Sequence, residues 1–520
     1  MKKGRNVRTD RKISLGLAGF MLLLLTFSAP ATTRYVDVNS ASPTPPYTSW
    51  PTAATNIQDA IDASIAGDVI SVTNGVYATG GKAMVSDLTN RVVLDKALTV
   101  VSVNGYSATI IQGAWDPTTT NGPLAVRCAW LTNGATLKGF TLRGGATRAP
   151  DNSIVEELQA GGGAWCSSLS ALITQCRITN SAARYGGGVS RGSLDRCILV
   201  GNTAASNGGG AYFSALTNSL IMANFANTFG GGAYSVYIYN CTITFNKAVV
   251  SQSSGIYNSG FGVVRNSILY NNQWPFQYNY FGGGGVSQPT YSCIYPSISG
   301  TGNISSDPQL LQVDGGYIAV TSPCRGNGSA AVATGFDIDG ESWDSPPSMG
   351  CDEPLESGLI GPLAVNAIAY GSETLPGRTL CFGGQVIGRA SRVAWFYGDG
   401  TYLTNASYLS TCHAWTNSGD YTVTFTAYNT DNPGGVSSNM IVHILPLQVP
   451  VLTAGGLVGT NFSLQFGGQS NANYFVEYAT NLASPITWLS LKSLTSTGGV
   501  VQITDTAATN AARFYRVRAQ

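Results

Sequence analysis

Short apolar runs separated by glycines recur along the middle of the chain. Triple glycines begin at Gly161, Gly186, Gly208 and Gly230, at steps of 25, 22 and 22 residues. Between them a phrase recurs in which two polar or cysteine residues lead into a short apolar run, as in Arg196-Cys197-Ile198-Leu199 and Asn240-Cys241-Thr242-Ile243. Asn202, Asn224 and Asn246 follow at intervals of 22. This pattern predicts a parallel β-solenoid whose equivalent residues stack from coil to coil, about 4.8 Å apart.

A leucine-rich repeat has a similar period and is the main alternative. It needs Leu-x-x-Leu-x-Leu phrases with an internal Asn, which these copies lack. We therefore favour the solenoid, in which small and amide residues form inward ladders or close tight corners. From Gly67 to Leu310, a period near 22 predicts about eleven coils.

The stretch before the first coil predicts a capping helix. Ile57, Ala60, Ile61 and Ile65 form one apolar helical stripe, and Thr55 with Gln58 has the spacing of a capping box. A strand is predicted at 69–72, and the helix would cover the open edge of the first coil.

These features carry a family resemblance. The phrases "GGGAY" and "NCTITFN", the opening "YVDVNSASPTPPYTSWPTAATNIQDAIDASIAGDVISVTNGVY" and the closing "SDPQLLQVDGGYIAVTSPC" resemble secreted right-handed parallel β-helix proteins of the pectate-lyase-like fold. The resemblance covers roughly residues 34–354. That fold hosts polysaccharide lyases and glycoside hydrolases, but a fold does not imply a function.

Two further β-domains are predicted behind the solenoid. "WFYGDGT", "HAW" and "GDYTVTF" resemble the PKD domain, an immunoglobulin-like β-sandwich, with Trp415 where the family usually has Tyr. Asp399-Gly400 is expected in a hairpin turn. In this resemblance Cys381 and Cys412 lie on core strands and are the best disulfide candidates. The last segment reads as a second small β-sandwich with Trp488 in its core, loosely similar to carboxy-terminal modules of secreted bacterial proteins.

The predicted architecture is therefore all-β: a right-handed parallel β-helix followed by two small immunoglobulin-like β-sandwich domains. The expected division is 1–31 signal peptide, 32–354 β-helix with its amino-terminal cap, 355–446 PKD-like sandwich and 447–520 carboxy-terminal sandwich. The signal peptide rests on a basic start, an apolar run at 13–27 and the small-x-small site Ala29-Pro30-Ala31. A membrane anchor is the alternative, but the apolar run is shorter than a span requires.

Charge narrows the range of partners. The chain has 28 Lys+Arg and 27 Asp+Glu, and charged residues make up 11% against an ordinary ~25%. Cleavage after residue 31 removes six basic residues and one acidic residue, which changes the net charge from +1 to −4. Without a basic cluster, we expect no nucleic-acid partner. We predict a secreted monomer, extracellular or at the cell surface, with no membrane span after cleavage.

Few residues that could act in catalysis occur in the part of the chain where this fold would place an active site. Between Leu158 and Ser306 there is one acidic residue, Asp195, and no Glu or His. A glycoside hydrolase needs two carboxylates, and a calcium-dependent lyase needs several. Asp195-Arg196 is better explained as a local ion pair, and the acids at 151–157 as a solvated loop. Three or more carboxylates converging in one groove would favour an enzyme.

Metal sites are also weakly indicated. The ten cysteines include no CxxC or Cys/His spacing, so zinc is not predicted, and Cys176, Cys197 and Cys241 are either bridged or stacked thiols. Asp337-Ile338-Asp339-Gly340-Glu341 alternates like a calcium loop but fails the EF-hand pattern at Ser342 and Ser348. A turn is favoured, with a weak structural calcium as the alternative, and no cofactor is predicted.

Aromatic residues give the better indication of a ligand. Trp274, Phe276, Tyr278 and Tyr280 interrupt the repeat and could stack on sugar rings, although packing over the solenoid flank would explain them too. The prediction is a secreted, non-catalytic β-helix protein that binds polysaccharide or a cell-surface glycan, or mediates adhesion. The alternative is a polysaccharide lyase or glycoside hydrolase of the pectate-lyase-like fold.

Overall fold

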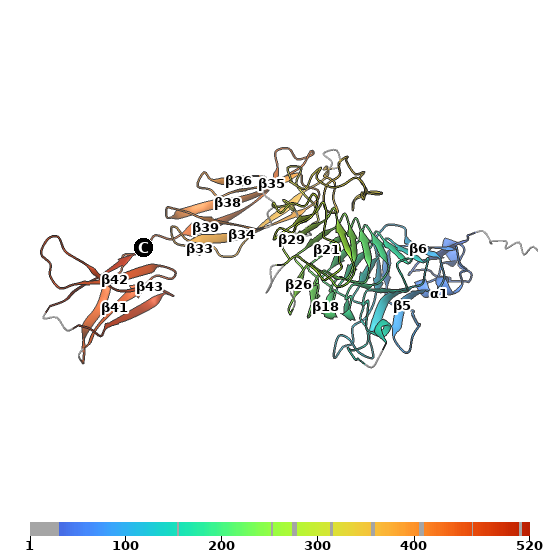
Figure 1. Ribbon diagram of the computed structural model, residues 1–520, viewed down its shortest axis with the longest axis horizontal. Helices are drawn as coiled ribbons and strands as arrows, with labels where there is room; N and C mark the ends of the chain where they lie inside the picture. The colour runs from blue at the N-terminus through green and yellow to red at the C-terminus, as the bar shows by residue number, and fades with distance from the viewer. Residues whose placement is uncertain are drawn as a thin grey trace, which may run out of the picture.

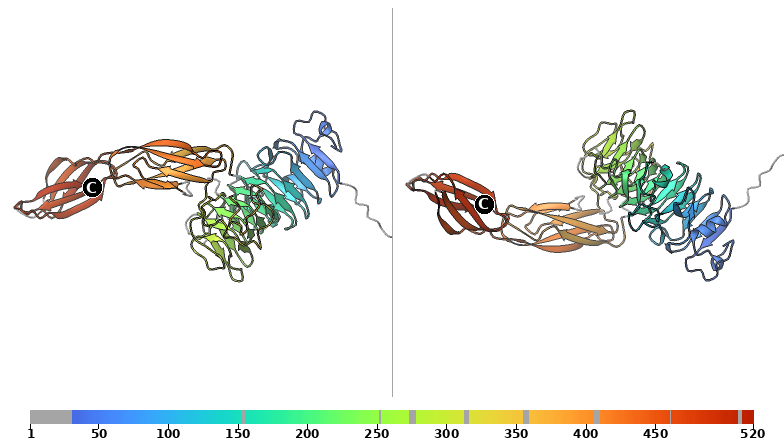
Figure 2. Two further views of the ribbon diagram at one scale, coloured as in Figure 1. Left: turned by 90° about the horizontal axis from the view of Figure 1, so that it is seen from above. Right: turned by 90° about the horizontal axis from the view of Figure 1, so that it is seen from below.

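A computed structural model describes residues 31–152, 155–250, 253–272, 278–311, 316–354, 359–404, 410–459, 461–508 and 512–520. In them the chain forms a right-handed parallel β-helix followed by two β-sandwiches, as the sequence predicted. Figure 1 shows the β-helix at one end of an elongated molecule and the sandwiches following it in turn (Figure 1). The perpendicular views show the same order (Figure 2).

Three sheets of nine strands each form the walls of the β-helix, and all their strand pairs are parallel except the first pair of the third sheet. Sheet A contains β1 (Thr33–Val36), β2 (Val69–Val72), β6 (Thr99–Ser102), β9 (Thr136–Lys138), β12 (Leu172–Thr174), β16 (Ser193–Asp195), β20 (Ala215–Thr217), β24 (Tyr237–Tyr239) and β28 (Val263–Arg265). Sheet B contains β3 (Gly75–Tyr77), β7 (Thr109–Gln112), β10 (Thr141–Arg143), β13 (Arg177–Thr179), β17 (Ile198–Val200), β21 (Leu220–Met222), β25 (Thr242–Thr244), β29 (Ile268–Tyr270) and β31 (Cys293–Ile294).

Sheet C forms the third side of the β-helix and carries most residues of the candidate functional site. It contains β4 (Lys82–Ala83), β5 (Thr89–Leu94), β8 (Val126–Leu131), β11 (Ala164–Cys166), β15 (Val189–Ser190), β19 (Ala211–Tyr212), β23 (Ala233–Tyr234), β27 (Ile256–Asn258) and β30 (Tyr280–Gly282). A smaller sheet D lies between sheets B and C in sequence order, with β14 (Ala182–Tyr185), β18 (Thr203–Asn207), β22 (Phe225–Ala226) and β26 (Lys247–Ala248).

The number of coils is smaller than predicted because the early coils are longer. Ser193 pairs with Ala215 and Ala215 with Tyr237, which is the expected 22-residue step. Thr99, in contrast, pairs with Thr136, a step of 37 residues. The glycine repeat lies in the later coils only, so extrapolating its period to the whole helix gave about eleven coils where each main sheet has nine strands.

The amino-terminal end is closed by α1 (Ile57–Asp62), with η1 (Trp50–Thr52) before it. The predicted capping box is wrong: Asn56 is the N-cap, and its side chain accepts from the Asp59 amide at 3.0 Å. Gln58 is instead buried and accepts from the Val93 amide at 2.7 Å, which ties the helix to sheet C. Ile65 lies outside the helix and is exposed.

A ladder of buried asparagines forms one inner corner of the β-helix. Asn202, Asn224, Asn246 and Asn272 each follow a sheet B strand and are buried. Each Nδ2 donates to the Oδ1 of the next member, at 2.8–3.0 Å. The ladder satisfies polar groups that would otherwise be costly inside an apolar core, so the predicted inward stacking of amides is confirmed.

The closing segment, residues 307–354, turns back over the outer face of sheet B. Leu220 and Met222 on that face pack with Cys351, and Ile268 packs with Met349. The Cys351 amide also donates to Thr242 Oγ1 at 3.2 Å. The later coils of sheet B are therefore covered, which leaves sheets A and C as the open walls.

Residues 329–336, here called the strap, are fastened to the corner between sheets A and B. The Nδ2 atoms of Asn218, Asn240 and Asn266 donate to the carbonyls of Thr334, Val332 and Ser329, respectively. These asparagines adopt φ of 48–51°, a region that Asn tolerates better than most residues. The strap therefore runs backward along the helix, held by one asparagine in each coil.

The middle sandwich pairs two sheets around Trp395, Trp415 and Phe425. One sheet contains β32 (Ala364–Ala369), β34 (Thr379–Ile387) and β37 (Ser410–Ala414); the other contains β33 (Glu373–Thr374), β35 (Arg392–Phe396), β36 (Tyr402–Thr404), β38 (Gly419–Tyr428) and β39 (Val436–Ile444). Cys381 and Cys412, the candidates from sequence, are joined by a disulfide between β34 and β37. β35 and β36 form the hairpin expected around Asp399-Gly400.

The last sandwich has β40 (Leu452–Val458), β41 (Asn461–Gly468) and β44 (Gly499–Asp505) in one sheet, and β42 (Asn473–Ala479), β43 (Leu489–Thr495) and β45 (Phe514–Ala519) in the other. Trp488 is not part of its core, contrary to the sequence prediction. It lines a groove beside β40, with the Arg516 guanidinium over its ring at 4.3 Å.

Residues 1–30, almost all of the predicted signal peptide, lie outside the described residues, so cleavage stays a prediction. In the part of the chain that the structure describes, no helix has the length and apolar character needed to cross a bilayer.

Candidate functional site

The outer face of sheet C carries a row of aromatic rings. In-register pairing places Trp130 beside Trp165, and further along it aligns Tyr212, Tyr234, Tyr257 and Phe281. Ring centroids of successive members lie 4.6–5.7 Å apart within each run, with the rings stacked. Because neighbouring rings cover one another, the row buries apolar area and gives the wall a rigid aromatic surface.

A pocket of about 570 Å³ opens beside this row, at the corner between sheets C and A. Its apolar wall comes from Phe213, Tyr237, Phe261 and Leu169. Phe213 stacks on Phe261 at 5.1 Å and meets Tyr212 edge to face at 4.4 Å. Its polar wall comes from Ser167, Ser168, Arg191 and Glu156. Aromatic rings with a few converging polar groups are typical of small-molecule and sugar sites.

The corner geometry explains why these side chains meet. Arg191 and Phe213 occupy the same place in successive coils, directly after β15 and β19, and both have positive φ, 62° and 53°. The Arg191 amide donates to the Tyr212 carbonyl and the Phe213 amide to the Tyr234 carbonyl, which fixes the corners to the stack. Such a backbone conformation is unfavourable for a residue with a side chain and persists only where surrounding contacts enforce it.

Glu156 reaches the pocket from an insertion, residues 144–160, that contains η2 (Glu156–Leu158). Its Oε1 lies 3.2 Å from Arg191 Nη2, with side chains 38% and 43% exposed, so the ion pair faces solvent. The next residue, Glu157, accepts from Trp130 Nε1 at 2.6 Å. The end of the 151–157 segment, interpreted from sequence as a solvated loop, is half-exposed and is also fastened to sheet C through Glu157.

Arg127 on β8 is the buried anchor of this insertion. It is 1% exposed; its Nε donates to the Gly161 carbonyl at 2.9 Å, and its Nη2 donates to the carbonyls of Ala160, at 2.9 Å, and Glu157. Its Nη1 donates to Asn90 Oδ1 at 2.8 Å. Burial, opposed by the Glu157 charge, lowers the pKa of Arg127 to about 10, so the guanidinium remains charged at neutral pH.

The charge of Glu156 also acts on the aromatic row. Burial and then the Glu156 carboxylate raise the pKa of Tyr212 above its ordinary value. Arg191 is the one cation among the residues that line the pocket, and Glu156 is the one carboxylate. The pocket thus combines three aromatic rings with a self-neutralised pair of charges.

The aromatic segment predicted from sequence is only partly described. Trp274 and Phe276 lie outside the described residues. Tyr278 is 54% exposed, whereas Tyr280 is buried in the β-helix core, where its ring offers no face to a ligand. Tyr280 packs inside the β-helix and not over its flank, and a ligand role for this segment stays a prediction that depends on its other members.

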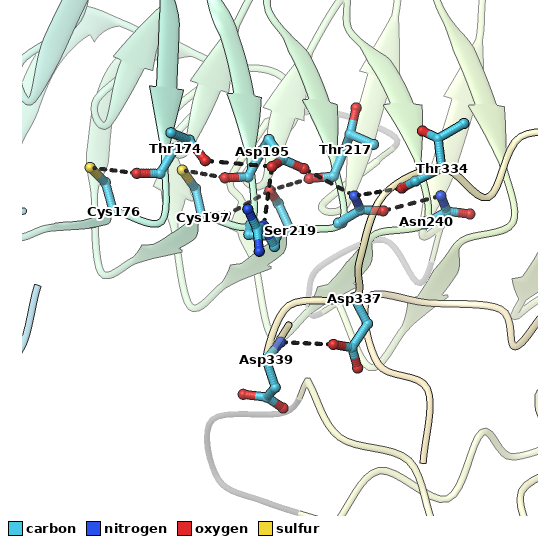
Figure 3. A network of polar contacts seen from close by, with 12 residues as sticks. Thr174, Cys176, Asp195, Cys197, Thr217, Ser219, Asn240, Thr334, Asp337 and Asp339 are labelled. Carbon is cyan, nitrogen blue, oxygen red and sulfur yellow. Dashed lines mark hydrogen bonds and ion pairs between the residues drawn. The ribbon is translucent and has the colours of Figure 1, made fainter. Parts of the chain in front are cut away.

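Asp195 takes part in the local ion pair expected for it. Its Oδ2 lies 3.2 Å from Arg196 Nε, and its Oδ1 accepts from Asn218 Nδ2 at 2.9 Å. Figure 3 shows Asp195 linked with Thr174 (Figure 3). Asn218 continues the connection from Asp195 to the strap at Thr334. Its carboxylate is therefore used in holding the A–B corner together.

Three carboxylates do converge elsewhere, but not in a groove. Asp337, Glu341 and Asp352 each place an oxygen within 4.8 Å of the others. Arg389 of the middle sandwich already supplies the cation, since its Nη2 lies 2.9 Å from Glu341 and 3.5 Å from Asp352. Asp337 Oδ1 accepts from the amides of Asp339 and Glu341, which confirms the predicted turn.

This cluster does not fit either of the chemistries considered for it. Asp337 is fully buried and Asp352 is 1% exposed, so a polysaccharide could not reach them. Arg389 lies against two of the three carboxylates, so a calcium ion there would compete with its guanidinium. We therefore assign the cluster to the junction between the closing segment and the middle sandwich, and not to a metal or catalytic site.

The pocket residues were missed by sequence reasoning, although part of the signal was present. Tyr212 and Tyr234 follow their glycine triplets at the same offset, 22 residues apart, which marks an outward column on sheet C. Phe213 directly follows the first of them. Nothing in the local sequence indicates that Glu156, in an insertion outside the repeat, meets Arg191 of a later coil.

Comparison with known proteins gives no family. No family model matches the chain, and no curated protein matches it. Among solved structures, a pectate lyase is 12% identical with a TM-score of 0.32 over 62% of this chain and 97% of its own. A rhamnogalacturonan lyase is 11% identical with a TM-score of 0.27, over 52% of this chain and 65% of its own.

A structure of carbohydrate-binding modules from the β-sandwich superfamily is 13% identical with a TM-score of 0.14, over 30% of this chain and 96% of its own. At TM-scores this low the similarities carry no argument about ligand or activity. The candidate site must be judged on its own geometry.

Proposed function

We propose that the protein is an extracellular, non-catalytic polysaccharide-binding protein, and that the pocket at the C–A corner is its glycan site. The observation that carries this is the joining of Phe213, Phe261 and Tyr237 with the Glu156–Arg191 pair in one open pocket. Sugar rings present apolar C–H faces to aromatic rings and hydroxyls to charged and polar groups, so both walls have a use.

The aromatic wall of sheet C extends this site along the β-helix. A polymer lying beside the row would follow a rigid surface whose repeat is the coil spacing, and a preorganised surface loses little entropy on binding. The two sandwiches follow the closing segment and extend away from the amino-terminal coils (Figure 1). This arrangement suits a protein that is attached through one end and presents its binding surface at the other. Adhesion to a glycan-coated surface is the form this function would take.

Catalysis is the alternative, and the pocket does not favour it. Hydrolysis of a glycosidic bond requires two carboxylates across the bond. Glu156 is the single carboxylate lining the pocket, and it is paired with Arg191; the neighbouring Glu157 accepts from the Trp130 indole. Release of unsaturated or reducing ends from a panel of neutral and acidic polysaccharides would establish an enzyme and overturn this part of the proposal.

The test is binding of the full chain to immobilised and soluble polysaccharides. We expect retention that falls at least tenfold in Phe213→Ala and Phe261→Ala, because each removes an aromatic face from the pocket. Tyr402→Ala, on an exposed ring of the middle sandwich, is the matched control. A second arm, Trp274→Ala with Tyr278→Ala, tests the segment predicted from sequence; loss there alone would move the site to that segment.

A further inference from the structure

We propose that this pocket takes uncharged sugar residues and discriminates against uronic acids. The inference rests on the proposed function and names its ligand class. It follows from the charge balance of Arg191, the one cation among the residues that line the pocket. Arg191 already has a carboxylate partner at 3.2 Å, so a uronate would bring a second carboxylate to a guanidinium whose charge is already balanced.

The electrostatic cost falls on Glu156. Its carboxylate lines the pocket beside Arg191, so a uronate that reached the guanidinium would lie within a few ångströms of a like charge. At such a separation two like charges near a protein surface repel each other, less so as salt screens them. Arg184 does not line the pocket; it donates to the backbone carbonyl of Asp151 and to Gln159 Oε1 of the insertion.

The remaining polar groups suit hydroxyls. Arg191 lines the pocket with a side chain that is 43% exposed, so its guanidinium offers N–H donors to a ligand. Glu156 supplies acceptor oxygens at the same place. Ser167 donates to Asn133 Oδ1 at 2.7 Å, which leaves its oxygen able to accept, whereas Ser168 donates to the same atom at 2.6 Å and already accepts from the Ser170 amide at 3.1 Å. A sugar hydroxyl both donates and accepts, and so matches this set.

The apolar wall adds to the same preference. Phe213 and Phe261 offer edges and faces to the C–H surface of a sugar ring but no charge. A neutral hexose or pentose residue can therefore contact both walls at once. A uronate that makes the same apolar contacts is also repelled by the Glu156 carboxylate. Discrimination of this type, by a repulsive element built into the site, is a general means of specificity.

The experiment measures affinity of the full chain by isothermal titration at about 0.15 M salt, where surface charges are screened over ~8 Å. Neutral probes are mixed-linkage glucan, xyloglucan and galactomannan; acidic probes are polygalacturonate and alginate. We expect binding to at least one neutral probe, with acidic probes at least tenfold weaker. In Glu156→Gln we expect acidic binding to rise at least fivefold, because Arg191 loses its carboxylate and the repulsion is removed.

Glu373→Gln, which removes a carboxylate from the middle sandwich, is the control and should leave both classes unchanged. Preference of the unaltered chain for an acidic probe would overturn the neutral-ligand inference and leave the proposed function intact. Binding to neutral probes with no gain of acidic binding in Glu156→Gln would overturn the charge argument. Absence of binding to every probe would overturn the proposed function itself. Circular dichroism melting of each variant ensures that folded proteins are compared.

Discussion

The guanidinium of Arg389 lies 2.9 Å from the carboxylate of Glu341, and this contact joins the middle sandwich to the closing segment of the β-helix. The same nitrogen reaches Asp339 at 3.4 Å and the buried Asp352 at 3.5 Å. Apolar contact supports the junction, since Leu311 and Ala319 of the closing segment belong to the core of the middle sandwich. The two parts therefore share both a core and an ion-pair cluster.

Replacing Arg389 should loosen this junction. In Arg389→Ala the carboxylates around it lose their cation, and removal of one partner from a buried pair typically costs about 3–5 kcal/mol. We expect a lower thermal midpoint and new proteolytic cleavage between the closing segment and the sandwich. Arg392→Ala is the control, because that guanidinium lies over the Tyr428 ring at 3.6 Å. Equal stability of the two variants would contradict the assignment.

The same cluster should make stability depend on pH in an unusual direction. Burial raises the pKa of Asp337 to about 6, and burial raises the pKa values of Asp339 and Asp352 as well. A carboxyl whose pKa is higher in the folded state than in the unfolded state favours folding when protonated. Its contribution is complete below about pH 4 and is lost as pH rises through about 6.

We therefore expect the free energy of unfolding to be higher near pH 5 than near pH 7.5, by about 1.4 kcal/mol from Asp337 alone. Hydrogen bonds from Thr401 and His413 outweigh burial and lower the pKa of Asp399 to about 2, so that carboxylate opposes the trend only in stronger acid. Urea unfolding across this range is the measurement. Asp337→Asn should flatten the profile, and an unchanged slope would refute the role of Asp337.

Arg127 offers a test of how the insertion is held. Arg127→Met would leave the acceptors at Glu157, Ala160, Gly161 and Asn90 without their donors, at about 1–3 kcal/mol for each buried group left unpaired. We expect faster hydrogen exchange and proteolysis in 144–160. Glycan affinity should fall with it, because Glu156 loses its position. Arg127→Lys keeps the charge but loses the several guanidinium donors, so we expect an intermediate effect. A loss of stability without any loss of glycan affinity would show that Arg127 does not position Glu156 for binding.

The asparagine ladder should be sensitive to a single deletion. Asn246 lies in the middle: its Oδ1 accepts from Asn224, and its Nδ2 donates to Asn272 Oδ1 at 2.8 Å. In Asn246→Ala both neighbours lose a buried partner, so we expect destabilisation of about 2–4 kcal/mol in chemical unfolding. Asn227→Ala, at an exposed position one strand away, should change stability by less than about 0.5 kcal/mol.

The free thiols provide a simple check of the core. Eight cysteines are unpaired and buried. Burial raises the pKa of Cys128, Cys166, Cys176 and Cys241 to about 12, so these sulfurs stay protonated and unreactive in the native protein. Titration with a disulfide reagent should find almost no thiol before unfolding and eight afterwards. Fewer than eight after unfolding would show additional disulfides.

The sequence predicted those parts of the fold that repeat or that follow local rules. The glycine triplets and the asparagines at intervals of 22 specified stacked coils, and 69–72 forms the predicted strand β2. The capping residue was misplaced by one position because Thr55 and Asn56 are both good caps, and tertiary contact with sheet C took Gln58 out of the cap. The coil number failed because insertions such as 144–160 do not share the period.

The candidate site could not be predicted from the sequence, for a related reason. Tyr212 and Tyr234 belong to a visible column, but Glu156 meets Arg191 only because Arg127, on a third strand, holds the insertion against sheet C. Such a meeting depends on three segments far apart in sequence. The predicted aromatic segment, in contrast, was chosen on local composition, which does not distinguish the exposed Tyr278 from the buried Tyr280.

The strap fixes the length of the β-helix. It advances by two or three residues for each coil it crosses, from Ser329 at Asn266 to Thr334 at Asn218, so its contacts hold only if the number of coils between those asparagines is unchanged. Deleting or duplicating one 22-residue unit there would put every later strap residue out of step with its asparagine. The strap's asparagine contacts end at Asn218, and beyond them Phe336 lies against Arg196 of the preceding coil. Coils can therefore be added in the amino-terminal half of the β-helix, whereas the strap fixes the number of coils in the carboxy-terminal half.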